Sequence, residues 1–76
     1  MFRINRVDIV SGDDLKPGKW HRDMQVIYTS KGIFIDNTAG FESPHWIAPD
    51  WRDYVDKKVK AKIVMNSGFA WLKLIE

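Results

Sequence analysis

Residues 57–75 read KKVKAKIVMNSGFAWLKLI, and this stretch decides the fold. Its first half alternates between lysines and apolar residues, which is the period of a half-buried β-strand. Asn66-Ser67-Gly68 follows as a turn, and a second alternating run returns over 69–75. The stretch therefore predicts a β-hairpin with one apolar face. Pairing Ala61 with Leu72 brings the apolar faces of the two strands together.

Three further strands are predicted upstream of this hairpin. Residues 2–10 form the first, and the apolar pattern changes phase near Asn5-Arg6, which indicates a bulge. Residues 23–36 form a second hairpin, closed by Ser30-Lys31-Gly32. Its return strand, 33–35, is apolar on both faces, so we expect a central strand that is covered on both sides.

The segment 37–50 between the two hairpins shows no regular period. Pro49 suits the first position of a helix, and Trp51, Tyr54 and Val55 then fall on one helical face. We therefore expect one short helix around 50–56, of two turns at most.

This element order predicts a mainly β fold over residues 1–76, a single small five-stranded antiparallel barrel. A helix between the third and fourth strands makes it OB-like. The alternative is a Src-homology-3-like barrel, whose last strands are often linked by a 3₁₀ turn. The expected core consists of Ile4, Val7, Ile9, Val26, Ile33, Ile35, Val59, Ala61, Ile63, Leu72 and Leu74.

Composition excludes several classes of protein. The chain has 76 residues and no cysteine, so it has neither disulfides nor zinc sites built on thiolates. No apolar run is long enough for a signal peptide or a membrane span. A cytoplasmic protein is therefore expected, with no membrane partner and an oligomeric state that the sequence leaves open.

Charge is divided unequally along the chain, although the net formal charge is only +2. Residues 57–76 hold five basic side chains and one acidic side chain, whereas residues 36–56 hold one basic and five acidic. The aromatic residues Trp, Tyr and Phe are concentrated in the same two segments. The sequence therefore offers two candidate binding surfaces of opposite charge.

The basic hairpin is the leading candidate, as a non-catalytic module for single-stranded or weakly sequence-specific nucleic acid. Its lysines would neutralise phosphates and its rings would stack on bases. The alternative is a purely structural role, in which the lysines keep the strand soluble and the two rings belong to the core. The candidate residues are Lys58, Lys60, Lys62, Phe69, Trp71 and Lys73.

The acidic segment 41–54 supports the alternative function, a small protein-binding module or inhibitor that occludes a larger partner. Aromatic side chains between prolines are typical anchors for a protein partner. The alternative is a purely structural role, in which Trp46 and Trp51 anchor the loop and fill the end of the barrel. The candidate residues are Phe41, Trp46, Asp50, Trp51 and Tyr54.

No enzyme, metal or cofactor is expected. The two histidines, His21 and His45, lie 24 residues apart with no zinc-type spacing around them. Ser43 near His45 is too generic a pair for a nucleophile and its base, and the five glycines form no phosphate loop.

Overall fold

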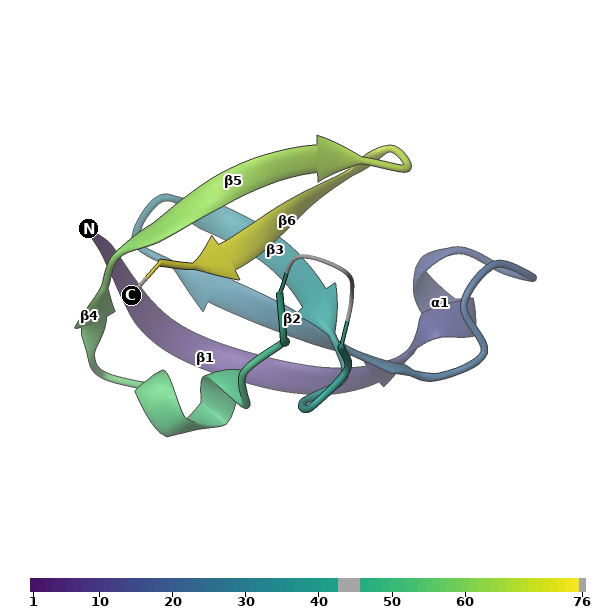
Figure 1. Cartoon of the computed structure of the whole chain (residues 1–76), viewed down its shortest axis with the longest axis horizontal. Coiled ribbons are helices and arrows are strands. Elements are labelled where there is room, and N and C mark those ends of the chain that lie inside the picture. The colour runs from purple at the N-terminus through teal and green to yellow at the C-terminus, as the bar shows by residue number, and fades with distance from the viewer. Residues whose placement is uncertain (43–45, 76) are drawn as a thin grey trace.

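The computed structural model describes residues 1–42 and 46–75. Strands dominate it, and the helical elements are each a single turn (Figure 1). Ser43, Pro44, His45 and Glu76 lie outside the described residues, so the interpretation of Ser43 with His45 has no structural counterpart. In chain order the elements are β1 (Phe2–Ser11), α1 (Gly12–Leu15), β2 (Asp23–Thr29), β3 (Gly32–Asn37), η1 (Trp51–Tyr54), β4 (Lys58–Val59), β5 (Ala61–Asn66) and β6 (Phe69–Leu74).

The strands form one sheet that curls into a nearly closed barrel. Its strand order is β4-β1-β2-β3-β6-β5. β4 and β5 stand at opposite ends of this order, yet only Lys60 separates them along the chain. The sheet must therefore curl until its two ends meet (Figure 1). The predicted small β-barrel is confirmed, with the predicted fourth strand broken at Lys60.

Two details of the predicted barrel differ. The barrel is not wholly antiparallel, because β3 and β6 meet at one parallel position where Ile35 lies opposite Trp71. The C-terminal hairpin is shifted by two residues, so that Ala61 faces Leu74 and Ile63 faces Leu72. A two-residue shift keeps every side chain on its predicted face, because the side-chain period of a strand is two. The tight Ser67-Gly68 turn, with positive φ at both residues, places Asn66 opposite Phe69 and so sets the observed register.

Two further predictions, the bulge in the first strand and the short helix, are confirmed at their predicted positions. The bulge in β1 falls between Ile4 and Arg6, at the predicted change of phase. The short helix is the 3₁₀ turn η1, which lies between β3 and β4 as the OB-like interpretation requires. Its Trp51 is fully buried and packs in the barrel interior beside Tyr54. α1 lies in the connection between β1 and β2, for which no helix was predicted.

The interior of the barrel holds a cluster of apolar side chains from all parts of the sheet. Predicted core residues Ile4, Val59 and Leu72 are buried there, and the ring of Phe2 meets Phe34 edge to face at 5.8 Å. A second apolar cluster covers the outer side of β2, β3 and β6, and it includes Val26 and Ile35. The sheet therefore has apolar contacts on both of its faces over these three strands.

Three predicted core residues are wrong. Ile9, Ile33 and Ile63 are 44%, 60% and 48% exposed. Ile33 is the second residue of β3, beside the hairpin turn, so the expectation of a strand covered on both sides over 33–35 holds only for Phe34 and Ile35. Ile63 belongs to β5, the last strand of the sheet, where no further strand covers it. Within the described residues, no helix is long and apolar enough to cross a membrane.

Candidate functional site

The loop between β1 and β2 places a tryptophan on the outer side of the sheet. Its two ends are joined by a hydrogen bond of 2.9 Å in which the Gly12 N–H donates to the Arg22 carbonyl. A Cβ at position 12 would lie 2.6 Å from both the Arg22 oxygen and the Trp20 Cβ. Only glycine permits this approach, and the closed loop holds Trp20 against the second apolar cluster.

Trp20 joins two rings of β6 in a packed aromatic group. Its ring lies 5.5 Å from that of Trp71 and 5.1 Å from that of Phe69, both edge-on. The Trp71 indole N–H donates to the Asn66 carbonyl at 3.0 Å, so its polar atom is satisfied. Trp20 and Trp71 are buried, whereas Phe69 is half-buried. Trp71 is therefore buried, as its purely structural role predicted.

Trp46 extends this group toward β5. The ammonium groups of Lys62 and Lys73 lie 4.4 and 5.4 Å from its ring centroid. The Lys73 ammonium also lies 5.2 Å from the Trp71 ring, so it connects the two indoles. We call the surface formed by Trp20, Trp46, Phe69 and Trp71 the aromatic face.

A polar layer fixes Lys73 beneath this face. Its ammonium pairs with Asp36 at 2.9 Å, and Asp36 is fully buried. The second carboxylate oxygen of Asp36 accepts the Trp51 indole N–H at 2.8 Å. Gln25, also fully buried, accepts the Trp51 backbone N–H and donates to the carbonyls of Asn37 and Pro49. This layer ties the 37–50 segment to the barrel.

Phe41 contacts the end of the β1–β2 loop. The guanidinium carbon of Arg22 lies 4.0 Å from its ring centroid, a stacking distance. The backbone N–H of Ala48 donates to the Phe41 carbonyl at 2.9 Å, so the segment folds back on itself. Phe41 and Trp46 are both half-buried and each is stacked on a cation.

Two lysines of the β1–β2 loop reach the turn of the C-terminal hairpin. The Lys19 ammonium donates to the Ser67 hydroxyl at 3.1 Å, and the Lys16 ammonium donates to the Ser67 carbonyl at 3.4 Å. No carboxylate among the described residues forms a salt bridge with Lys16, Lys19, Arg22 or Lys62. The contacts described for these four cations include neutral groups, which are Ser67 for Lys16 and Lys19, Phe41 for Arg22 and Trp46 for Lys62.

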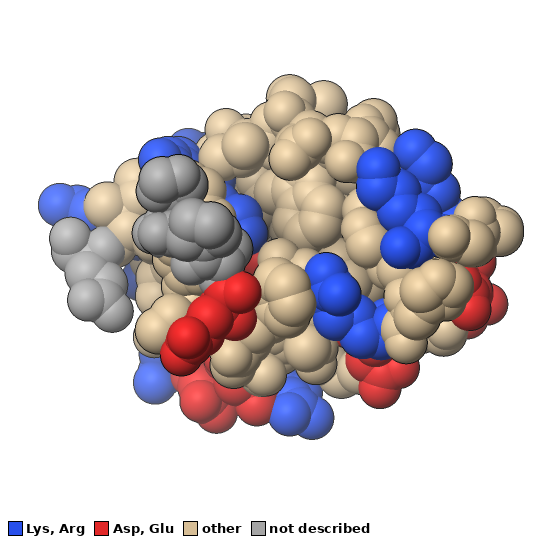
Figure 2. All heavy atoms as spheres, turned by 45° about the vertical axis from the view of Figure 1, so that its right-hand side comes forward, with Lys and Arg blue, Asp and Glu red and all other residues tan. Residues whose placement is uncertain are grey.

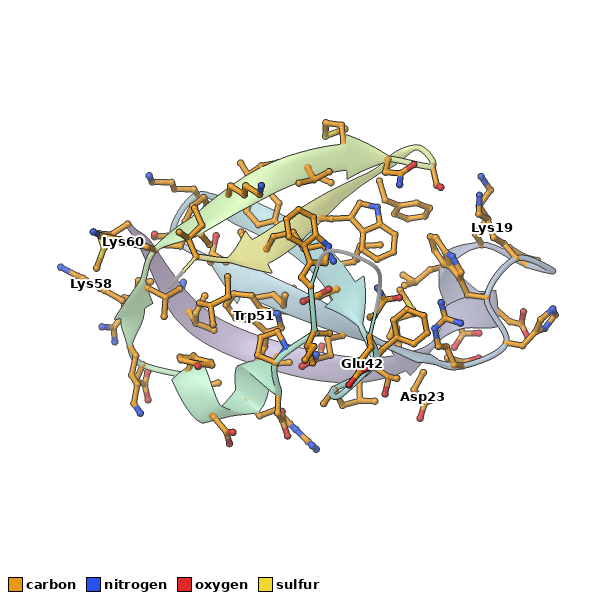
Figure 3. All side chains as sticks on the ribbon, in the orientation of Figure 1. Lys19, Asp23, Glu42, Trp51, Lys58 and Lys60 are labelled. Carbon is orange, nitrogen blue, oxygen red and sulfur yellow. The ribbon has the colours of Figure 1, made fainter. Side chains whose placement is uncertain are left out.

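Figure 2 turns this end of the molecule toward the viewer. It shows a largely uncharged surface, hollowed near its centre, with Lys and Arg side chains beside it and acidic side chains mainly below. In the view of Figure 3 the labelled Glu42 and Asp23 are both at the lower right, and Lys19 is further to the right and higher, on the loop.

The predicted nucleic-acid residues do not form one patch. Lys62 and Phe69 belong to the aromatic face or its rim, but Lys58 and Lys60 lie at the opposite end of the barrel from Lys19 (Figure 3). There the pKa of the Met1 amino group is lowered chiefly by the charge of Lys31, with burial and the charges of Lys58 and Lys60 adding to it. The alternation of 57–65 hides this separation, because the strand breaks and turns at Lys60.

The predicted protein-binding residues are also divided. Trp51 is fully buried, as the purely structural role predicted for it requires. Asp50 caps η1 by accepting the Arg52 backbone N–H, and the Arg52 guanidinium binds both of its oxygens at 2.8 and 2.7 Å. These bonds lower the pKa of Asp50. Tyr54 packs on the interior cluster, and like Phe41, Trp46 and Asp50 it is half-buried.

Lys16, Lys19, Arg22 and Ser67 are site residues that the sequence motifs did not assign. The available signal was the run KPGKWHR at 16–22, in which three cations surround Trp20. Trp20 in this run is buried, and the three cations lie beside it in the β1–β2 loop.

No group of three or more His, Asp or Glu within residues 1–42 and 46–75 is arranged to hold a metal ion. Comparison of the chain with protein-family models, curated proteins and solved structures finds no significant match. Any function has to be inferred from the chemistry of the site.

Proposed function

We propose that this protein is a non-catalytic module that binds single-stranded nucleic acid across the aromatic face. The observation that carries the proposal is the junction of Lys16 and Lys19 with Ser67 at the border of that face. It joins the loop after the first strand to the turn before the last strand. OB-type barrels bind oligonucleotides on the sheet surface between these two loops.

The cations and the aromatic rings of the site would contact different parts of the nucleic acid. Lys16, Lys19, Arg22 and Lys62 would hold backbone phosphates, since none of them pairs with a described carboxylate. The half-buried rings of Phe41, Trp46 and Phe69 would stack on bases, each worth about 1–3 kcal/mol. The buried Trp20 and Trp71 would support the surface from below without touching the ligand.

A single strand fits this face better than a duplex. Stacking on aromatic rings requires bases that are not already stacked and paired. The side chains beside the rings are chiefly cations, which recognise phosphates and carry little sequence information. We therefore expect weak sequence preference and strong dependence on salt.

Charge reversal at the two ends of the barrel tests the proposal with a matched control. The K16E/K19E and K58E/K60E variants change the net charge equally, and all four lysines are exposed. Fluorescence anisotropy with a labelled single-stranded oligonucleotide would measure both. The first variant should weaken binding by at least about tenfold more than the second. Equal losses would show that binding follows net charge and not this site.

The protein-binding function stays a prediction, as does the cytoplasmic setting. Of the five residues proposed for protein binding, Trp51 is fully buried, whereas Phe41, Trp46, Asp50 and Tyr54 are half-buried. A protein partner that still binds K16E/K19E with wild-type affinity, while oligonucleotides do not bind the wild type, would favour that function.

A further inference from the structure

The outer edge of β5 has no partner strand in the described sheet. β5 stands last in the strand order, and its Ile63 and Met65 are 48% and 71% exposed. An exposed, apolar strand edge is a template for pairing with another strand. Proteins usually protect such edges with proline, a bulge or several charges. β5 has no proline and no shift of register, and Lys62 is its one charged residue.

The register of the hairpin identifies the backbone groups on this edge. The Ile75 N–H donates to the Lys60 carbonyl at 2.9 Å, so these two residues form a hydrogen-bonded pair of the ladder. Hydrogen-bonded and non-hydrogen-bonded pairs alternate along antiparallel strands. Ala61, Ile63 and Met65 therefore direct their N–H and C=O groups away from β6. Outside the β5–β6 ladder, no hydrogen bond among the described residues involves them.

We propose that this edge pairs with the β5 edge of a second copy of the chain, which gives a twofold-symmetric dimer. An antiparallel pair of identical strands is self-complementary about a twofold axis. Among the registers that place outward-facing residues opposite each other, two overlap the strand most fully. They place Ile63 opposite either the partner's Ile63 or the partner's Met65. In both registers the outward backbone groups face each other and can form ladder hydrogen bonds.

The charge pattern of β5 is what selects a second copy as the occupant. An occupant must present apolar side chains to Ile63 and Met65 and a neutral side chain to Lys62, because like charges directly opposite destabilise a sheet. β5 itself meets both requirements. In the two registers Lys62 lies opposite either the partner's Val64 or the partner's Asn66, and no lysine faces a lysine. The proposal does not depend on nucleic-acid binding.

Analytical ultracentrifugation of the full chain without nucleic acid tests the dimer, from roughly 1 µM to 1 mM. We expect the average mass to rise toward twice that of the monomer. The I63K/M65K variant should stay monomeric over the whole range. The I33K variant is the matched control, because Ile33 is 60% exposed but lies in β3, between two other strands. It should associate like the wild type.

Amide hydrogen exchange of the wild type supplies a readout that needs no variant to fold. The amides of Ile63 and Met65 should become protected as concentration rises, whereas those of Lys62 and Val64 should be protected already at low concentration. A wild type that stays monomeric, a dimer that persists in I63K/M65K, or exchange at Ile63 and Met65 that ignores concentration would overturn the proposal.

Discussion

The ammonium of Lys73 lies 2.9 Å from the carboxylate of Asp36, inside a layer where Asp36 is fully buried. Lys73 is thereby removed from the set of free cations that the alternation of the C-terminal hairpin suggested. The same carboxylate holds the indole of Trp51, so this one acidic side chain connects β3, β6 and η1.

We predict that K73M destabilises the fold by about 3–5 kcal/mol, because it leaves the Asp36 charge buried without its partner. Urea unfolding followed by tryptophan fluorescence measures this directly. The double variant K73M/D36N keeps an acceptor for the Trp51 indole but removes the buried charge, so it should be more stable than K73M. A loss below about 1 kcal/mol in K73M would mean that the pair is not desolvated as described.

The close approach at Gly12 gives a second prediction. G12A places a methyl group against backbone of Arg22, which cannot move aside as a flexible side chain would. We expect a loss of about 1–3 kcal/mol in the free energy of unfolding. The aromatic signals of Trp20 in the NMR spectrum should shift as the loop moves. An unchanged spectrum together with unchanged stability would refute the tight closure of this loop.

Phe41 offers a test of stacking that leaves the core intact. F41A should weaken single-stranded oligonucleotide binding by about 1–3 kcal/mol, the usual contribution of one stacked base. I47A is its control, because Ile47 is an apolar residue of the same segment and is 62% exposed. Equal affinities of F41A and I47A would remove Phe41 from the binding surface.

The pair of Asp50 and Arg52 predicts a pH dependence of stability. Hydrogen bonds from Arg52 lower the pKa of Asp50 in the folded chain relative to the unfolded chain. The stabilisation is therefore complete above the unfolded carboxyl pKa of about 3.9, and is lost as pH falls through the folded value. D50N should be less stable than the wild type at neutral pH, with a difference that shrinks in acid. Thermal unfolding across this pH range measures it, and a difference independent of pH would contradict the assignment.

The barrel could be predicted because its signals are local. The alternation of 57–75 and the turn at Asn66-Ser67-Gly68 determine a hairpin wherever it packs. Ile63 shows the limit of such signals. The strand period assigns its side chain to a face, but only the assembled sheet shows that β5 lies at an edge where this face is uncovered.

The site was harder to predict because long-range contacts build it. Lys19 and Ser67 are 48 residues apart in sequence, and no local pattern connects them. Trp71 lies on the lysine-bearing face of its strand, as predicted. That face is buried nonetheless, because Trp20 from a distant loop covers it and Lys73 pairs with Asp36 below. The alternation therefore indicated the correct face and left its exposure open.

The most direct test of the proposed function is a titration of labelled single-stranded DNA and RNA with the wild-type protein at several salt concentrations. Four phosphate contacts would give a slope of log affinity against log salt of about −3 for a single strand. K16E/K19E should flatten that slope, since two of the four contacts are lost. Measurable binding at about 50 mM salt that weakens steeply with added salt is the predicted result. No binding at that salt concentration, where phosphate contacts are strongest, would contradict the proposed function.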